Sequence, residues 1–341
     1  MNFLDILKNY EKIAIVGTGK NAGKTVALNE FISTGAENSI NMGITSIGRD
    51  GERQDIVTST EKPAIFVPAG TLVATAEVCL KSFSARAEIL DVTPFETAMG
   101  RVIICRTVED GFIEIAGPDT NKEIKEVCNM MMGLGAKVTL IDGALNRKTQ
   151  ASPAVADGVI LSTGAVLSRD MEIVIDKTKH LVNILTLPKL MGEIEGVARQ
   201  AIEGGFVSFI DSNNNIIETN YKTALGCSDK IISEVREDYE YIVLPGTLMN
   251  SFLKSMQGLL RFKKIGIIVS DGTKLFTEPM DYKIFKKLGG RVEVVEPINL
   301  LAVTVNPYSP EGYYFEPKLF LEAMKEALYP MKVLDCMQGG N

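Results

Sequence analysis

Short apolar runs alternate with amphipathic stretches along the first half of the chain. The run from Ile13 to Val16 breaks at Gly17, and after a short loop apolar residues recur at helical spacing from Val26 to Ile32. The same order of extended run, loop and helix returns several times before residue 205. Alternating strands and helices are typical of a mostly parallel sheet with helices on both faces. The pattern therefore predicts an α/β fold.

Strands are expected where β-branched and apolar residues cluster between turn residues. In the first half these stretches are 40–47, 63–67, 87–92, 102–106, 112–116, 137–141 and 156–161. Helices are expected over 71–80, from Asp119 or Thr120 to about residue 134, and over 170–179, whereas 181–187 is expected to be extended.

A domain boundary is predicted between residues 195 and 205, where Pro188 precedes a helical stretch that ends at Gly204-Gly205. The chain is then divided into a nucleotide-binding domain, 1–195, and a smaller α/β domain, 205–341, as a possible partner-binding part. The second domain is expected to open with a hairpin over 206–217. Its later strands are expected at 241–244, 264–269 and 291–295, and its last helix at 318–328. The stretch 306–317 is expected to be an irregular loop and the tail after Pro330 to be frayed.

The stretch from residue 12 to residue 31 has the order strand, Gly-rich loop, helix, and the loop ends in Gly23-Lys24-Thr25. In a phosphate-binding loop the backbone N–H groups surround the phosphates, the Lys contacts the β and γ oxygens, and the hydroxyl holds Mg²⁺. The standard spacing places the first Gly at position 18, where this chain has Thr18. The alternative is a Gly-rich turn that binds nothing. The predicted contacts are Gly17, Thr18, Gly19, Lys20, Asn21, Ala22, Gly23, Lys24 and Thr25.

Acidic residues follow two of the predicted strands. Asp142 ends a buried apolar strand and precedes Gly143, as the Mg²⁺-organising acid of phosphate-loop proteins does. Asp50 or Asp55, after the strand 40–47, is a further candidate for the metal. A helix or turn cap is the alternative for Asp142, and a solvated loop is the alternative for the other two. Lys24 and Asp142 are the residues expected to act in catalysis.

The loop after Asp142 brings two basic residues, Arg147 and Lys148, into a short polar span. Arg147 is predicted to contact the nucleotide. Both residues are candidates either for the γ-phosphate or for docking a protein partner, and solvated loop charges are the remaining interpretation.

Composition narrows the class of protein. The chain has 341 residues, 45% hydrophobic and 23% charged, with a net charge of −7, which favours an ordinary globular protein over one that binds a nucleic-acid backbone. Its five cysteines form no C-x-x-C pair, so they are expected to be small buried residues. The single histidine, His180, is expected to be solvated rather than a ligand. Without an apolar stretch of about 18 residues or a signal-peptide pattern, a cytoplasmic protein is expected.

Several of these blocks together resemble a known family. The loop Gly17–Thr25 resembles that of the dethiobiotin synthetase and cobyrinate amidase branch, in which Gly-Thr opens the loop. With the segments 48–52, 142–148 and 156–158, it resembles the KamB-type proteins of anaerobic lysine fermentation, a subunit of the reactivase for lysine 5,6-aminomutase. This resemblance spans mainly residues 12–165.

The resemblance implies a chaperone-like ATPase that releases damaged cobalamin from an adenosylcobalamin-dependent aminomutase, with a MutS-like ATPase as partner. Two other classes stay open: an ATP-dependent carboxylate ligase of dethiobiotin-synthetase type, and a nucleotide-binding regulator with little turnover. ATP is favoured over GTP because the chain lacks an N-K-x-D motif for guanine. The expected cofactors are therefore ATP and Mg²⁺.

Overall fold

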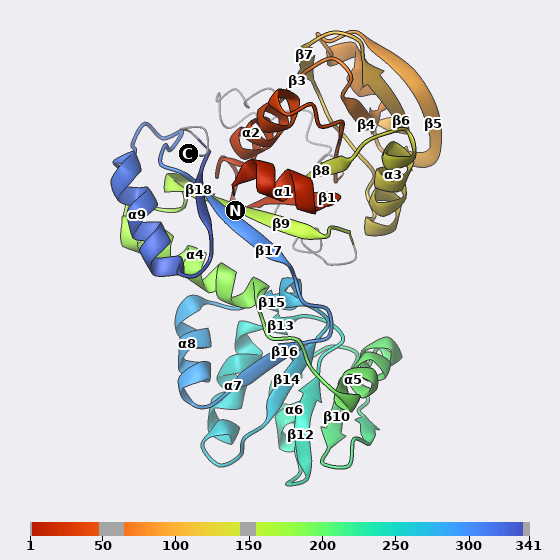
Figure 1. Ribbon diagram of the computed structural model, residues 1–341. Coiled ribbons are helices and arrows are strands. Elements are labelled where there is room, and N and C mark those ends of the chain that lie inside the picture. Colours follow the sequence, from red (N-terminus) through yellow and green to blue (C-terminus); the bar gives the residue numbers. More distant parts are fainter. Residues whose placement is uncertain (1, 48–64, 144–154, 337–341) are drawn as a thin grey trace. The chain divides into compact units, whose positions relative to one another are not determined.

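The computed structural model describes residues 2–47, 65–143 and 155–336. The chain divides into two compact units (Figure 1). The first unit comprises Met1–Thr178 and Asn299–Asn341, and the second comprises Lys179–Ile298. This division differs from the predicted boundaries in two respects: the second unit begins at Lys179 rather than near residue 205, and the C-terminal segment belongs with the beginning of the chain.

The first unit is organised around a nine-stranded sheet with the order β18-β17-β9-β1-β8-β2-β4-β6-β5. Every neighbouring pair from β18 to β4 is parallel, whereas the pairs β4–β6 and β6–β5 are antiparallel. The predicted mostly parallel sheet is confirmed. Its strands are β1 (Lys12–Gly17), β2 (Met42–Ser46), β4 (Leu72–Ala76), β5 (Ala87–Thr97), β6 (Gly100–Thr107), β8 (Val138–Asp142), β9 (Gly158–Gly164), β17 (Leu300–Asn306) and β18 (Val333–Asp335). A separate two-stranded sheet pairs β3 (Ile65–Val67) with β7 (Gly111–Ile113).

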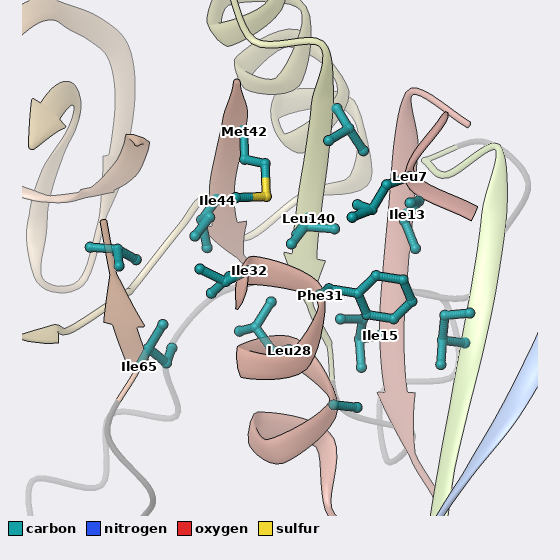
Figure 2. Close-up of a cluster of buried hydrophobic side chains, with 14 of the residues drawn as sticks. Leu7, Ile13, Ile15, Leu28, Phe31, Ile32, Met42, Ile44, Ile65 and Leu140 are labelled. Atoms are coloured by element: carbon teal, nitrogen blue, oxygen red, sulfur yellow. The ribbon is translucent and has the colours of Figure 1, made fainter. Parts of the chain in front are cut away.

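Helices pack on this sheet through alternate residues of its strands. Figure 2 shows the apolar side of α2 (Lys24–Glu37), with Leu28 and Phe31, packed against side chains of β1, β2 and β8. Met42 and Ile44 of β2 belong to this cluster, whereas the position between them, Gly43, faces Met131 of α3 (Asn121–Gly133). Successive strand residues point to opposite faces, so α2 and α3 cover opposite faces of the sheet.

The N-terminal helix α1 (Phe3–Asn9) joins the same core. Asn2 and Asp5 form a reciprocal capping box at its start. The Phe3 ring meets the Phe31 ring edge to face, with 4.8 Å between centroids, and both side chains are buried. Burial of one such apolar side chain stabilises the fold by about 1.5–3 kcal/mol, so this cluster anchors α2 firmly behind the loop that precedes it. The last helix of the first unit is α9 (Pro317–Leu328).

The second unit has a five-stranded sheet with the order β11-β10-β12-β14-β16. The antiparallel pair β10 and β11 confirms the predicted hairpin, and β12, β14 and β16 run parallel to one another. The strands are β10 (Ser208–Asp211), β11 (Ile216–Glu218), β12 (Tyr239–Val243), β14 (Gly266–Val269) and β16 (Arg291–Val294), and a short pair joins β13 (Leu248–Met249) to β15 (Leu275–Phe276). The helices are α5 (Glu193–Gly204), α6 (Ser228–Ser233), α7 (Asn250–Leu260) and α8 (Pro279–Lys287).

Three predicted elements are wrong. Residues 71–80 form β4 and the short helix η1 (Glu77–Ser82), because β4 is buried on both faces and so lacks the alternation of an exposed strand. Residues 181–187 are not an extended segment, because α4 (Met171–Leu185) continues as far as Leu185. The tail after Pro330 is not frayed throughout, since β18 pairs with β17 in the large sheet.

Candidate functional site

A tight turn joins β1 to α2 at the carboxyl edge of the large sheet. Asn21 and Gly23 adopt left-handed conformations, with φ of 61° and 98°. Asn and Gly are the residues that most readily adopt this conformation. The Ala27 N–H then bonds to the Gly23 carbonyl at 2.9 Å, so α2 begins directly after the turn. The predicted order of strand, loop and helix over residues 12–31 is confirmed.

Lys24 lies back across the loop. A Cβ atom on Gly17 would lie 2.6 Å from Lys24 Cγ, so a side chain at position 17 would displace the lysine. The Lys24 ammonium donates to the Gly143 carbonyl at 2.7 Å. Its positive charge is therefore held where β1 and β8 end side by side.

Asp142 is the last residue of β8 and is half-buried. It pairs in register with Ile15 of β1 and with Ser46 of β2, and the Gly143 N–H bonds to the Ile15 carbonyl at 3.0 Å. The carbonyl group that accepts from Lys24 thus belongs to Gly143, the residue that follows this carboxylate in the chain. Two of the residues predicted to act together, Lys24 and Asp142, belong to one edge of the sheet.

The other side of the loop rests on β9 and β17. The Thr18 N–H donates to the Ser162 carbonyl at 2.8 Å, which continues the pairing between β1 and β9. A Cβ atom on Gly23 would lie 2.8 Å from Asn306 Cβ, and one on Gly164 would overlap the Asn306 carbonyl oxygen. Asn306 therefore lies against both glycines.

The sequence interpretation did not include Asn306, because it did not predict β17. The mostly apolar run Leu300 to Val305 was the available signal, since it is β-branched in part and is followed by a polar residue, as β8 ends in Asp142. A strand assigned there would have placed Asn306 at the same edge.

Of the remaining predicted site residues, some lie within the described part of the chain and others lie outside it. Thr25 is half-buried in the first turn of α2, Lys20 is exposed, and Ala22 is buried. Four predicted residues lie outside the described residues: Asp50, Asp55, Arg147 and Lys148.

The cysteine side chains are mostly buried. Cys79, Cys105, Cys128 and Cys336 are buried, as predicted, and Cys227 is half-buried. Burial raises the pKa of Cys105 to about 11 and that of Cys336 to about 12, so both stay protonated at neutral pH.

The prediction that His180 is solvated is wrong. His180 is only 8% exposed, and its Nε2 lies 2.7 Å from the Thr277 carbonyl oxygen in the second unit. The helix α4 continues past it with apolar residues, which brings the imidazole into a packed environment beside Tyr282.

The described residues also bear on metals and membranes. No group of three or more His, Cys, Asp or Glu side chains gathers as a metal site within 2–47, 65–143 and 155–336. Over the same ranges, no helix is long and apolar enough to cross a membrane.

Comparison of the chain with protein-family models, with curated proteins and with solved structures found no match. Inferences about function therefore depend on the residues of the site.

Proposed function

We propose that the chain is a phosphate-loop protein that binds Mg-ATP at residues 17–25. The observation that carries this proposal is the position of Lys24, whose stem crosses Gly17 and whose ammonium lies 2.7 Å from the Gly143 carbonyl, next to Asp142. A turn with only a structural purpose does not need a lysine folded over it. A phosphate group needs both the cation and the surrounding N–H groups.

The start of α2 adds to the attraction for an anion. The helix has 14 residues, its N-cap is Gly23, and its first turn contains no acidic residue. The first N–H groups of a helix have no partner within it, and the aligned peptide dipoles place partial positive charge there. These groups and Lys24 favour the β- and γ-phosphates of a nucleotide at the same place.

The residues at this edge also fit a magnesium ion. Mg²⁺ takes oxygen ligands and is usually held by one or two carboxylates together with substrate phosphates, so a dedicated cluster of acidic residues is not required. The Thr25 hydroxyl and the Asp142 carboxylate are the groups proposed to hold it. A bound Mg²⁺ would neutralise charge on the phosphate oxygens.

The resemblance to the reactivase subunits extends the proposal to a biological role. In that role the chain uses ATP to reactivate an adenosylcobalamin-dependent aminomutase, and a partner completes the competent geometry. The measurement that separates this role from a carboxylate ligase is the ATPase rate of the full chain with the aminomutase or with small carboxylic acids. Stimulation by the protein supports the reactivase role, whereas turnover only with a carboxylic acid supports the ligase.

The proposed binding site is tested by the variant Lys24→Ala, measured by titration calorimetry with Mg-ATP. Removal of the ammonium should raise Kd at least about tenfold, which corresponds to about 1.4 kcal/mol. The matched control is Lys8→Ala, which removes the same charge from an exposed position on α1. Its Kd should equal that of the wild type.

Thermal unfolding shows whether Lys24→Ala keeps the fold, which should survive because α2 is held mainly by its buried apolar side. A folded Lys24→Ala variant with wild-type affinity for ATP would overturn the proposal. Equal weakening by Lys8→Ala would also count against it, because the effect would then reflect net charge alone.

A further inference from the structure

A chain of hydroxyl groups runs from the phosphate loop into the interior of the first unit. Thr163 Oγ1 lies 3.5 Å from Thr18 Oγ1 and 2.7 Å from Thr178 Oγ1 on α4. Thr178 Oγ1 donates to the Val174 carbonyl at 2.8 Å. Thr163 and Thr178 are both fully buried, so they are shielded from solvent.

The direction of these bonds follows from the number of hydrogens. A hydroxyl has one hydrogen to donate and two lone pairs that accept. Since Thr178 gives its hydrogen to Val174, Thr163 must donate to Thr178. Thr163 then has lone pairs left to accept from Thr18, which directs the Thr18 hydroxyl toward the interior.

Thr18 is therefore held by two successive residues of β9. The Ser162 carbonyl accepts a hydrogen bond from the Thr18 N–H at 2.8 Å, and the Thr163 hydroxyl accepts one from the Thr18 hydroxyl. The Ser162 hydroxyl points to the other face of the sheet, where it bonds to Thr304 at 2.8 Å. The backbone and the side chain of Thr18 thus have separate partners.

Stability alone does not explain two buried hydroxyls at positions 163 and 178. Replacing both partners of a buried hydrogen bond by apolar groups of the same shape is often nearly neutral. A role for the hydroxyls is found at the loop instead, because Thr18 occupies the position where the standard phosphate loop has Gly. A side chain at that position must be held in one orientation for the loop to keep its shape.

We propose that Thr163 and Thr178 are positioning residues for the phosphate loop: they fix the Thr18 side chain and, through it, the first turn of the loop. Neither residue is proposed to touch the nucleotide. The inference deepens the proposed function and rests on it only where ATP affinity is concerned.

The first test needs no nucleotide. Hydrogen exchange of the loop amides is measured in the full chain for Thr163→Val and for Thr163→Val/Thr178→Val. Loss of the hydroxyl chain should speed exchange of the amides from Thr18 to Gly23 by about threefold to tenfold, the range expected for one hydrogen bond. The control is Thr139→Val, which removes a buried hydroxyl that donates to the Glu11 carbonyl at the amino edge of the same sheet.

A second variant separates the hydroxyl from the shape of the side chain. Thr163→Ser keeps the hydroxyl and loses the methyl group, whereas Thr163→Val keeps the shape and loses the hydroxyl. Exchange and Kd for Mg-ATP should stay near wild type in the Ser variant. In the Val variants Kd should rise about threefold to tenfold with little change in Tm.

Unchanged loop exchange in both Val variants would overturn the inference, and so would a Ser variant as impaired as the Val variant. A wild-type chain that binds no ATP would remove the proposed function alone. If its loop exchange still depended on the Thr163 hydroxyl, the positioning role would stand.

Discussion

The parallel strands of both units end in loops that carry small, polar and acidic residues, and the two sets of loops use their polar groups differently. In the first unit, Gly23 caps α2 without a side chain and Lys24 spans the loop to Gly143. In the second unit, the corresponding loop after β14 contains Asp271, which is buried.

The Asp271 carboxylate accepts hydrogen bonds from residues of its own turn. It accepts from the Thr273 N–H at 2.8 Å, from the Thr273 hydroxyl, and from the Ser270 hydroxyl at 3.1 Å. After β16, the Glu296 carboxylate bonds to Arg199 of α5 at 2.5 Å. The acidic groups at this edge therefore bond to protein groups, and turn chemistry accounts for Asp271-Gly272.

This difference shows that parallel topology alone does not make a ligand site. Strand ends bring polar residues to one edge in both units. In the first unit Lys24 bonds to a backbone carbonyl beside Asp142 at the start of α2, whereas in the second unit Lys254 of α7 forms an ion pair with Asp281 in the first turn of α8. Function is inferred from such residues rather than from the fold.

The largest expected effect is a loss of stability at the carboxyl edge of the second unit's sheet, where Asp271 and Gly272 lie. A Cβ atom on Gly272 would overlap the Ile184 carbonyl oxygen, which cannot move without moving α4. The variant Gly272→Ala should therefore lose about 3 kcal/mol of unfolding free energy, measured by urea denaturation.

Gly246→Ala is the matched control, because nothing lies within 4 Å of an added Cβ there. Its unfolding free energy should change by less than about 1 kcal/mol. An equal loss of stability in Gly246→Ala and Gly272→Ala would contradict the structural role given to Gly272.

The sequence was sufficient to predict a mostly parallel sheet and the candidate loop, for a physical reason, although β4 and β17 of that sheet were not predicted as strands. The run Ile13 to Val16 is apolar at every position, as a strand buried on both faces must be, and the glycines of the loop are needed for its turn. These signals are local. A common edge for the ends of β1 and β8 was also accessible, because parallel strands end at one edge of a sheet, whereas their direct pairing was not predicted.

The errors arose where local pattern and tertiary environment disagree. Residues 72–76 are buried at every position and form a strand because they pair with β2 on one side and with β6 on the other, which the local pattern does not show. The strand β17 lies in the large sheet between β9 and β18, although it follows the second unit in the chain. Sequence order therefore assigned it to the wrong part of the molecule, and Asn306 with it.

A smaller effect, on nucleotide binding, is expected from Asp142→Asn at the carboxyl edge of the first unit's sheet. This variant keeps the shape of the side chain and removes the charge proposed to hold Mg²⁺. Affinity for ATP should become nearly independent of Mg²⁺, a loss of about tenfold in the presence of the ion, and any hydrolysis should fall sharply. Calorimetry with and without Mg²⁺ measures the difference.

Asp271→Asn is the control at the equivalent edge of the second unit, since an amide oxygen can still cap the turn. Its Mg²⁺ dependence should match that of the wild type. Wild-type Mg²⁺ dependence in Asp142→Asn would make the assignment wrong and would leave Asp50 or Asp55 as the candidates.

The smallest expected effect separates the two units by their response to acid. In the second unit the Asn215 side chain, together with backbone N–H groups of Asn215 and Asn213, lowers the pKa of Asp211. In the first unit burial, and then the charge of Glu37, raises the pKa of Glu30. The two carboxyl groups should therefore contribute to stability with opposite signs.

The variants Asp211→Asn and Glu30→Gln make these signs measurable. A lowered pKa means that the charged form of Asp211 stabilises the fold above its unfolded pKa of about 4, and that this stabilisation is lost as pH falls through the folded pKa. Asp211→Asn should thus be less stable than wild type at pH 7, with the gap closing below about pH 4. Glu30→Gln should be slightly more stable than wild type at pH 7, because it removes a charge that burial disfavours, and this advantage should also vanish in acid. The measurement is the urea midpoint of each variant and of the wild type from pH 7 to pH 3. Stability differences from the wild type that have the same sign for both variants at pH 7 would contradict the opposite contributions of Asp211 and Glu30.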